Sequence, residues 1–162
     1  GKLQVAQWLL EVKPDINISI DNEYAFRWAC RLGHLDIAQW LLKIKPDINI
    51  SANDNYAFRE SFIHKYFDVA QWLLNLNPNI KNSNHIFKDV FKIACIGGSL
   101  QMVKWLLEVK PDIDISANNH YPFIVACRYK ADDVALWLAS LNLNYVIVIE
   151  NDIIMDYYVK KV

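Results

Sequence analysis

The sequence predicts an all-α solenoid, a stack of helix-turn-helix units that repeat along one chain. A tryptophan recurs every 32 or 33 residues, and this fixed period is typical of stacked repeat units. Apolar residues follow helical spacing around each tryptophan. A proline stands six residues after four of them, where a helix cannot continue. The recurring residues are Trp8, Trp40, Trp72, Trp105 and Trp137.

The tryptophan segment is predicted to be the second, longer helix of each unit. Residues 33–51 read GHLDIAQWLLKIKPDINIS, and residues 1–19 read almost the same, GKLQVAQWLLEVKPDINIS. In the former, Leu35, Ala38 and Leu41 recur at helical spacing and predict a buried stripe. The tryptophans are predicted to belong to this core. The less favoured alternative is that the five form a stripe that binds a partner.

A shorter first helix and a polar turn, here called the finger, complete each predicted unit. The first helix appears in YPFIVACRY, residues 121–129, where Pro122 suits a first turn. Asp54 or Asn55 can cap the first helix that follows the finger ISAND. The fingers are expected to be β-turns or hairpins. The predicted units are a partial one at 1–19, then 20–51, 52–83, 84–116 and 117–147, and a terminal half unit at 148–162.

Three places are expected to depart from the regular unit. The finger KNSNHIFKD, residues 81–89, carries one extra residue and is predicted to be irregular. The terminal segment NDIIMDYYVKK, residues 151–161, is predicted to be a last short helix. Because Gly1 falls inside a repeated phrase, the chain is expected to be part of a longer one.

Composition restricts the class of protein. The net charge of −1 opposes a general attraction to nucleic acid or to anionic membranes. No apolar run approaches the roughly 18 residues of a membrane-spanning helix. The odd number of cysteines, Cys30, Cys95 and Cys127, predicts buried free thiols in a reducing, intracellular compartment, the cytoplasm of the producing or host cell.

The unit resembles the ankyrin repeat. Residues 29–42, ACRLGHLDIAQWLL, are similar to the family's Ala-Ala-x-x-Gly-His-Leu segment, and YPFIVAC places Phe123 at the leucine of its Thr-Pro-Leu-His opening. KPDIN stands where the family has Gly-Ala-Asp-Val-Asn. The resemblance covers almost the whole chain and implies a protein–protein interaction scaffold. The Trp-Leu-Leu and Lys-Pro segments resemble those of ankyrin proteins of giant DNA viruses of amoebae. This resemblance implies capture of host proteins.

The sequence contains no group of residues with the spacing of a catalytic or metal-binding site. The four histidines lie on different units, and none has metal-ligand spacing. Gly97-Gly98-Ser99 lacks the Lys-Ser/Thr pair of a phosphate-binding loop. The sequence therefore predicts no enzyme, no metal, no cofactor and no small-molecule substrate.

The predicted binding surface is the concave face formed by fingers and first helices. We call its first-helix part the palm, and it is expected to be exposed and basic. A protein partner with an acidic surface is expected, although a merely solvated polar face is an open alternative. Nucleic-acid binding is the other alternative, and it would need a larger basic excess. The predicted residues are Arg27, Arg31, Arg59, His64, Lys92 and Arg128 on the first helices, and Glu23, Asp54, Asn55, Lys88 and His120 on the fingers.

Two asparagines invite a further interpretation. Leu9 to Asn17 and Leu41 to Asn49 follow a Leu-x5-Asp-Ile-Asn pattern. This pattern resembles sites of asparagine hydroxylation in ankyrin proteins, which would make the chain a substrate of an asparaginyl hydroxylase. The favoured alternative is that both asparagines hydrogen-bond the finger turn.

Overall fold

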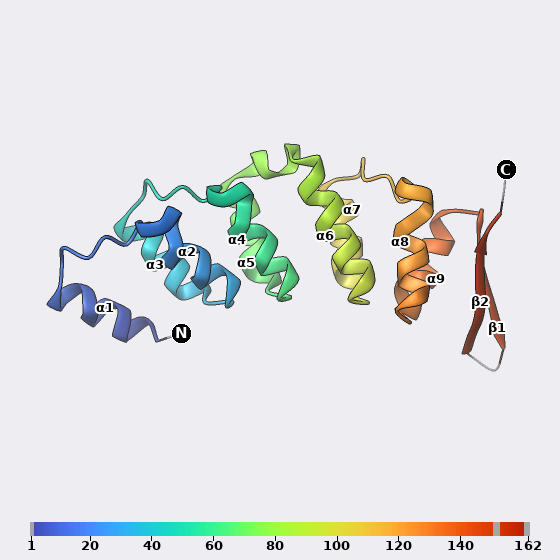
Figure 1. Ribbon diagram of the computed structural model, residues 1–162, viewed down its shortest axis with the longest axis horizontal. Helices are drawn as coiled ribbons and strands as arrows, with labels where there is room; N and C mark the ends of the chain where they lie inside the picture. The colour runs from blue at the N-terminus through green and yellow to red at the C-terminus, as the bar shows by residue number, and fades with distance from the viewer. Residues whose placement is uncertain (1, 151–152, 161–162) are drawn as a thin grey trace. The chain divides into compact units, whose positions relative to one another are not determined.

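The computed structural model describes residues 2–150 and 153–160, and nine α-helices lie within them (Figure 1). The prediction of an all-α repeat array is confirmed. The helices are α1 (Leu3–Val12), α2 (Ile20–Arg31), α3 (Leu35–Ile44), α4 (Ala52–Ile63), α5 (Phe67–Leu76), α6 (Asn84–Ile96), α7 (Leu100–Val109), α8 (Ala117–Arg128) and α9 (Asp132–Leu141). A 3₁₀ helix, η1 (Pro78–Asn82), and two strands, β1 (Tyr145–Glu150) and β2 (Ile153–Val159), complete the described elements.

The chain divides into two compact parts, Gly1–Asn82 and Ser83–Val162, here called the N-terminal and C-terminal parts. In the N-terminal part, α2 packs on α3 and α4, and α4 packs on α5. Phenylalanines fill the space between these helices: Phe26, Phe58 and Phe62 are almost fully buried. Phe26 and Phe58 stand 32 residues apart, so the repeat in sequence becomes a repeat in the core.

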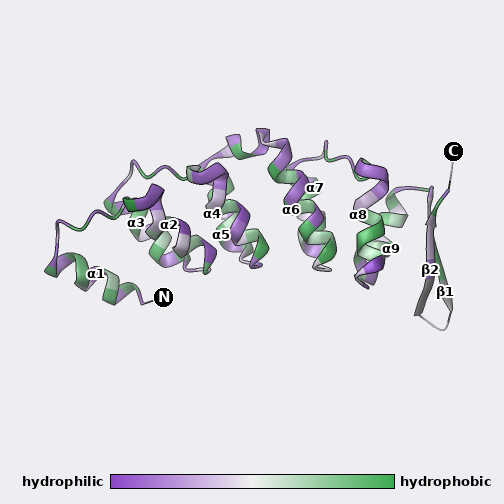
Figure 2. Ribbon diagram, viewed as in Figure 1, coloured by the Kyte–Doolittle hydropathy of each residue, from purple (hydrophilic) through white to green (hydrophobic). Residues whose placement is uncertain are grey.

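The fingers are turns with a left-handed backbone rather than hairpins. Asp21–Glu23, Asn53–Asn55 and Asn118–His120 have φ values between 53° and 64°. Left-handed backbone costs an L-residue roughly 1–2 kcal/mol, and least for Asn and Asp, which dominate these triplets. Figure 2 shows the hydrophilic colour over the starts of α2, α4 and α8. The expected Asn55 cap is wrong, because the buried Asn55 Oδ1 has no hydrogen-bond partner. Pro122 lies inside α8 rather than at its start, at the second residue after the left-handed triplet Asn118–His120.

The finger at residues 81–89 departs from this pattern, as predicted. The 3₁₀ helix η1 occupies Pro78–Asn82, and α6 starts at Asn84 without a left-handed triplet. In the C-terminal part, α6 packs on α7 and α8, and α8 packs on α9. The equivalent phenylalanines are Phe91 and Phe123, both almost fully buried.

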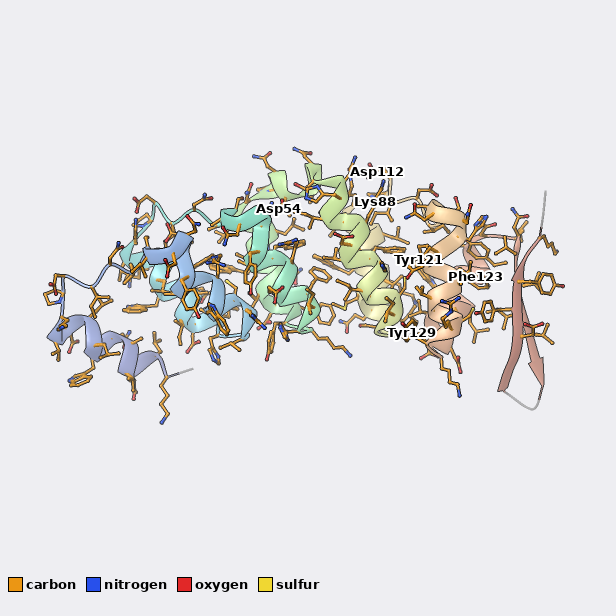
Figure 3. All side chains as sticks on the ribbon, viewed as in Figure 1. Asp54, Lys88, Asp112, Tyr121, Phe123 and Tyr129 are labelled. Carbon is orange, nitrogen blue, oxygen red and sulfur yellow. The ribbon has the colours of Figure 1, made fainter. Side chains whose placement is uncertain are left out.

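The terminal helix predicted for residues 151–161 is wrong for the residues that the structure describes. There, β2 occupies Ile153–Val159 and pairs antiparallel with β1. Residues 151, 152 and 161 lie outside the described chain. β-branched and aromatic residues dominate both runs and favour strands. Tyr145 stacks on Phe123, with ring centroids 4.2 Å apart, and Tyr157 meets the same ring edge-on at 6.2 Å. Figure 3 labels Phe123 on α8, where β2 packs.

The tryptophans are less buried than predicted. Trp40, Trp72, Trp105 and Trp137 are partly buried, and the Trp72 ring lies 6.2 Å from that of Phe26. Trp8 is 57% exposed, which contradicts a core position. The reason is that no first helix packs on α1 within the described chain, and α1 has no buried residue. The three cysteines are free and buried, as predicted.

The turn between the two helices of a unit also uses a left-handed residue. Gly33 and Gly98 have φ values of 73° and 67°, and Lys65 and Lys130 occupy the same position with φ values of 64° and 56°. A Cβ atom added to Gly33 would overlap the ring of Tyr66, whereas one added to Gly98 would lie 3.4 Å from the Cβ of Ala131. Gly33 is therefore needed chiefly for its lack of a side chain, because lysines adopt the same left-handed backbone in other units.

Candidate protein-binding site

In the N-terminal part, aromatic and charged side chains of α2 and α4 form one connected surface, here called the aromatic palm: Tyr24, Trp28, Arg31, Tyr56 and Glu60. The first three lie on one face of α2 because they are four and three residues apart. Tyr24 and Trp28 have ring centroids 5.4 Å apart, and the Arg31 guanidinium lies 4.7 Å from the Trp28 ring centroid. Arg31 Nη1 donates to Tyr56 Oη at 3.0 Å and so connects the two helices.

The charge of this surface is more balanced than the sequence predicted. Arg31 Nε lies 3.4 Å from Glu60 Oε2, and His64 Nε2 lies 3.6 Å from the same oxygen. Glu60 therefore offsets the positive charge of its neighbours. The aromatic palm is an amphipathic platform of rings and paired charges rather than a basic stripe.

Arg27 was expected to be an exposed palm residue, and this expectation is wrong: it is only 8% exposed. Its Nε donates to the Asn22 carbonyl oxygen and its Nη2 to the Asp21 carbonyl oxygen, both at 2.7 Å. The guanidinium also lies 5.0 Å from the Tyr56 ring centroid. Arg27 therefore ties the left-handed turn to its helix. Glu23 was expected at a finger tip but is also buried, where it accepts a hydrogen bond from Ser19 Oγ.

Arg59 occupies the position of Arg27 one unit later, yet its contacts differ. Its nearest carboxylate oxygen is Asp54 Oδ2, at 3.8 Å from Nη1, and about a third of its side chain is exposed. The buried atoms Arg59 Nε and Asn55 Oδ1 have no hydrogen-bond partner. Asn55 lies in the left-handed turn at the start of α4, and Arg59 lies four residues later in its right-handed part.

The C-terminal part brings together a second group of predicted residues. Lys88 and Lys92 of α6 and Tyr121 of α8 line a cleft of about 280 Å³, and Lys92 Nζ lies 4.9 Å from the Tyr121 ring centroid. Figure 3 labels Lys88 near the start of α6 and Tyr121 on the adjacent α8. Asp89 and Asp114 also line this cleft. Hydrogen bonds from the Ser116 side chain and backbone lower the pKa of Asp114.

His120 and Arg128 lie outside this cleft. His120 Nδ1 is 3.1 Å from Tyr145 Oη, which donates to the Ile115 carbonyl oxygen at 3.1 Å. His120 thus joins its finger to β1, while Arg128 is exposed at the end of α8.

Comparison with protein families accounts for this architecture. The family model described as ankyrin repeats (3 copies) matches residues 1–84 and 56–148. The chain belongs to the ankyrin-repeat family. None of the curated proteins searched matches it. Ankyrin repeats are generally protein–protein interaction modules, and members of the family are typically non-enzymatic scaffolds.

The described part of this ankyrin-repeat chain has no group of three His, Cys, Asp or Glu side chains that could hold a metal ion. No helix in it is long and apolar enough to cross a membrane. The residues that sequence reasoning missed are the palm tyrosines. A signal was present, because Tyr24, Tyr56 and Tyr121 each follow a left-handed triplet directly.

Proposed function

We propose that this ankyrin-repeat chain is a scaffold that binds a partner protein through its fingers and first helices, with the aromatic palm as a main contact. Binding hot spots are enriched in Trp, Tyr and Arg, the residue types that α2 and α4 place together here. Tyr24 is 46% exposed although its ring already lies beside Trp28. A partner that covers these rings buries apolar surface at a small cost in side-chain entropy, because neighbouring side chains already hold the rings in place.

The observation that carries the proposal is the pair of unpartnered buried atoms on α4. Leaving a buried polar group unsatisfied costs about 1–3 kcal/mol, so native proteins keep few of them. Arg59 Nε requires an acceptor and Asn55 Oδ1 requires a donor. Both atoms are covered, so a partner reaches the guanidinium only after the Arg59 side chain, about a third of which is exposed, turns outward; a partner carboxylate then supplies the acceptor that Nε lacks. This supports a partner with an acidic surface, since a guanidinium binds carboxylates through two parallel hydrogen bonds.

A host protein is the proposed source of this partner, on the strength of the resemblance to ankyrin proteins of giant DNA viruses. The three buried free thiols support a reducing, intracellular location for the encounter. Nucleic acid is the less supported partner, because Glu60 offsets the positive charge of Arg31. Modification by an asparaginyl hydroxylase is a separate and less favoured proposal: Asn17 and Asn49 are exposed, but their Oδ1 atoms accept hydrogen bonds from the Ser19 and Ser51 N–H groups at 3.0 and 3.1 Å, as the favoured alternative predicted.

The test is affinity capture from host lysate, followed by measurement of the dissociation constant of the captured protein. Arg59→Glu replaces the donor by a charge of opposite sign and is expected to weaken binding at least tenfold, about 1.4 kcal/mol. The matched control is Lys43→Glu, which makes the same charge change at an exposed position of the second helix α3. If both variants bind the partner as tightly as the parent chain does, or if both weaken equally, the first helix α4 is not part of the site.

A further inference from the structure

The outer edge of β2 presents backbone groups that the hairpin does not use. The Lys160 N–H donates to the Asn144 carbonyl oxygen at 2.8 Å and therefore points toward β1. In an antiparallel ladder this direction alternates from one residue to the next. The N–H and C=O groups of Tyr157 and Val159 consequently point away from β1. The Tyr157 N–H donates to the Asp156 carboxylate of its own strand at 2.8 Å, which agrees with this direction.

A cleft of about 790 Å³ runs along this edge. One side of it is lined by Tyr157, Tyr158 and Val159 of β2, by Lys160 just after β2 and by Asn144 just before β1, and the other side by α8. The α8 residues that line it are Asn119, His120 and Ile124. Apart from the Tyr157 N–H, which Asp156 already accepts, the outward backbone groups of Tyr157 and Val159 therefore lie beside a cleft whose other side is α8.

We propose that this edge binds an extended segment of a partner protein as a third strand of the sheet. Outward N–H and C=O groups that recur every second residue match only a partner with extended backbone. Such strand addition draws affinity from main-chain hydrogen bonds and specificity from alternate side chains. The proposal does not rest on the aromatic palm, which lies in the N-terminal part.

The side chains that line the cleft define the segment further. Ile124 and Val159 provide apolar surface, while His120 and Lys160 provide a base and a positive charge, and none of the lining residues is acidic. Asp156 is adjacent in sequence but does not line the cleft. An extended segment with an apolar residue and, two residues away on the same face, an acidic residue complements these groups.

A second copy of this chain fits the edge poorly. Pairing of two β2 edges about a two-fold axis would place the α8 helix of each copy beneath the strand of the other. That space is already occupied, because α8 packs against β2 and lines the cleft. A peptide segment without a helix beneath it avoids this overlap.

The probe is a display library of random seven-residue peptides, selected on the purified chain, with the enriched peptides synthesised for titration. Val159→Pro removes the outward N–H and leaves the β1–β2 ladder intact, because that N–H is not part of the ladder. We expect Val159→Pro to weaken binding about tenfold or more. The control Val159→Thr, which retains the N–H and the branched shape, should bind within about twofold of the parent.

A second measurement distinguishes strand addition from side-chain docking alone. Peptide binding should slow hydrogen exchange at the Val159 amide, and N-methylation of those peptide amides that face β2 should abolish binding. Methylation of the alternate amides should leave it intact. Arg59→Glu, on α4 of the N-terminal part, should not alter this binding, so failure here is separable from failure of the proposed function. The proposal is overturned if no peptide is enriched, if Val159→Pro binds as the parent does, or if the edge pairs with a second copy in sedimentation.

Discussion

The role of Arg27 can be tested by comparing it with Arg59, its equivalent one unit later. Arg27→Ala removes the two hydrogen bonds that hold the carbonyl groups of Asp21 and Asn22 in the left-handed turn. Arg59→Ala removes a side chain whose Nε has no hydrogen-bond partner and whose nearest carboxylate oxygen is 3.8 Å away. The same substitution in the same helical position therefore separates the turn-holding role from the general cost of losing an arginine.

The expected magnitude follows from these contacts. A hydrogen bond from a charged donor contributes roughly 1.5–3 kcal/mol, and the contact with the Tyr56 ring adds about 0.5–2 kcal/mol. These contributions are not additive, because the turn can relax once the guanidinium is gone. We therefore expect Arg27→Ala to lower the free energy of unfolding of the N-terminal part by about 3 kcal/mol. Arg59→Ala should cost less than about 1 kcal/mol.

Urea denaturation followed by tryptophan fluorescence measures both variants, and thermal melts should place Arg27→Ala about 6–12 °C below the parent. Arg27→Lys serves as a further control, because it keeps the charge but cannot bond two carbonyl groups in the same planar geometry. Its stability should lie between that of the parent and that of Arg27→Ala. Equal destabilisation by Arg27→Ala and Arg59→Ala would refute the assignment of Arg27 to the turn.

Three further outcomes are expected. Trp72→Ala should lower the melting temperature sharply, because Trp72 is partly buried near Phe26 at the middle of a nearest-neighbour stack, whereas the exposed Gln71→Ala should be nearly silent in the same melt. Burial raises the pKa of each cysteine thiol from 9.0 to about 12, so the thiols should resist iodoacetamide until urea unfolds the chain. Because the unfolded thiols ionise first, the free energy of unfolding should be undiminished below pH 9 and should fall as the pH rises from 9 toward 12. Incubation with an asparaginyl hydroxylase should leave the mass unchanged, because the Oδ1 atoms of Asn17 and Asn49 already accept hydrogen bonds from the Ser19 and Ser51 N–H groups of their turns; one added oxygen at either asparagine would contradict this expectation.

The periodic features of the fold were predictable because they arise from residues that recur. A tryptophan and a proline at fixed spacing determined the second helices, and an extra residue in KNSNHIFKD marked the irregular finger. The terminal hairpin was missed because alignment with earlier units imposed a helix on residues 151–161. The local β-branched and aromatic composition, a better guide there, favoured strands.

The candidate site was less predictable because exposure depends on which neighbour a long side chain finds. Arg27 and Arg59 are the same residue at equivalent positions, yet one bonds the turn beneath it and the other does not. Their sequence contexts, DNEYAFR and NDNYAFR, differ only within the triplet. Identical spacing therefore fixes the helix face of a residue but not the partner of its charged end.

The contact between Gly33 and Tyr66 has a consequence for how this repeat array can diverge. Any side chain at residue 33 meets the ring at residue 66, so residue 33 can gain a side chain only if residue 66 becomes smaller. Gly98 faces the small side chain of Ala131, which leaves room for a Cβ atom at residue 98. Among related chains, we expect a larger residue at position 33 to occur only with a smaller one at position 66. The side chain at residue 66 thus limits what residue 33 can become, although the two residues belong to successive repeats.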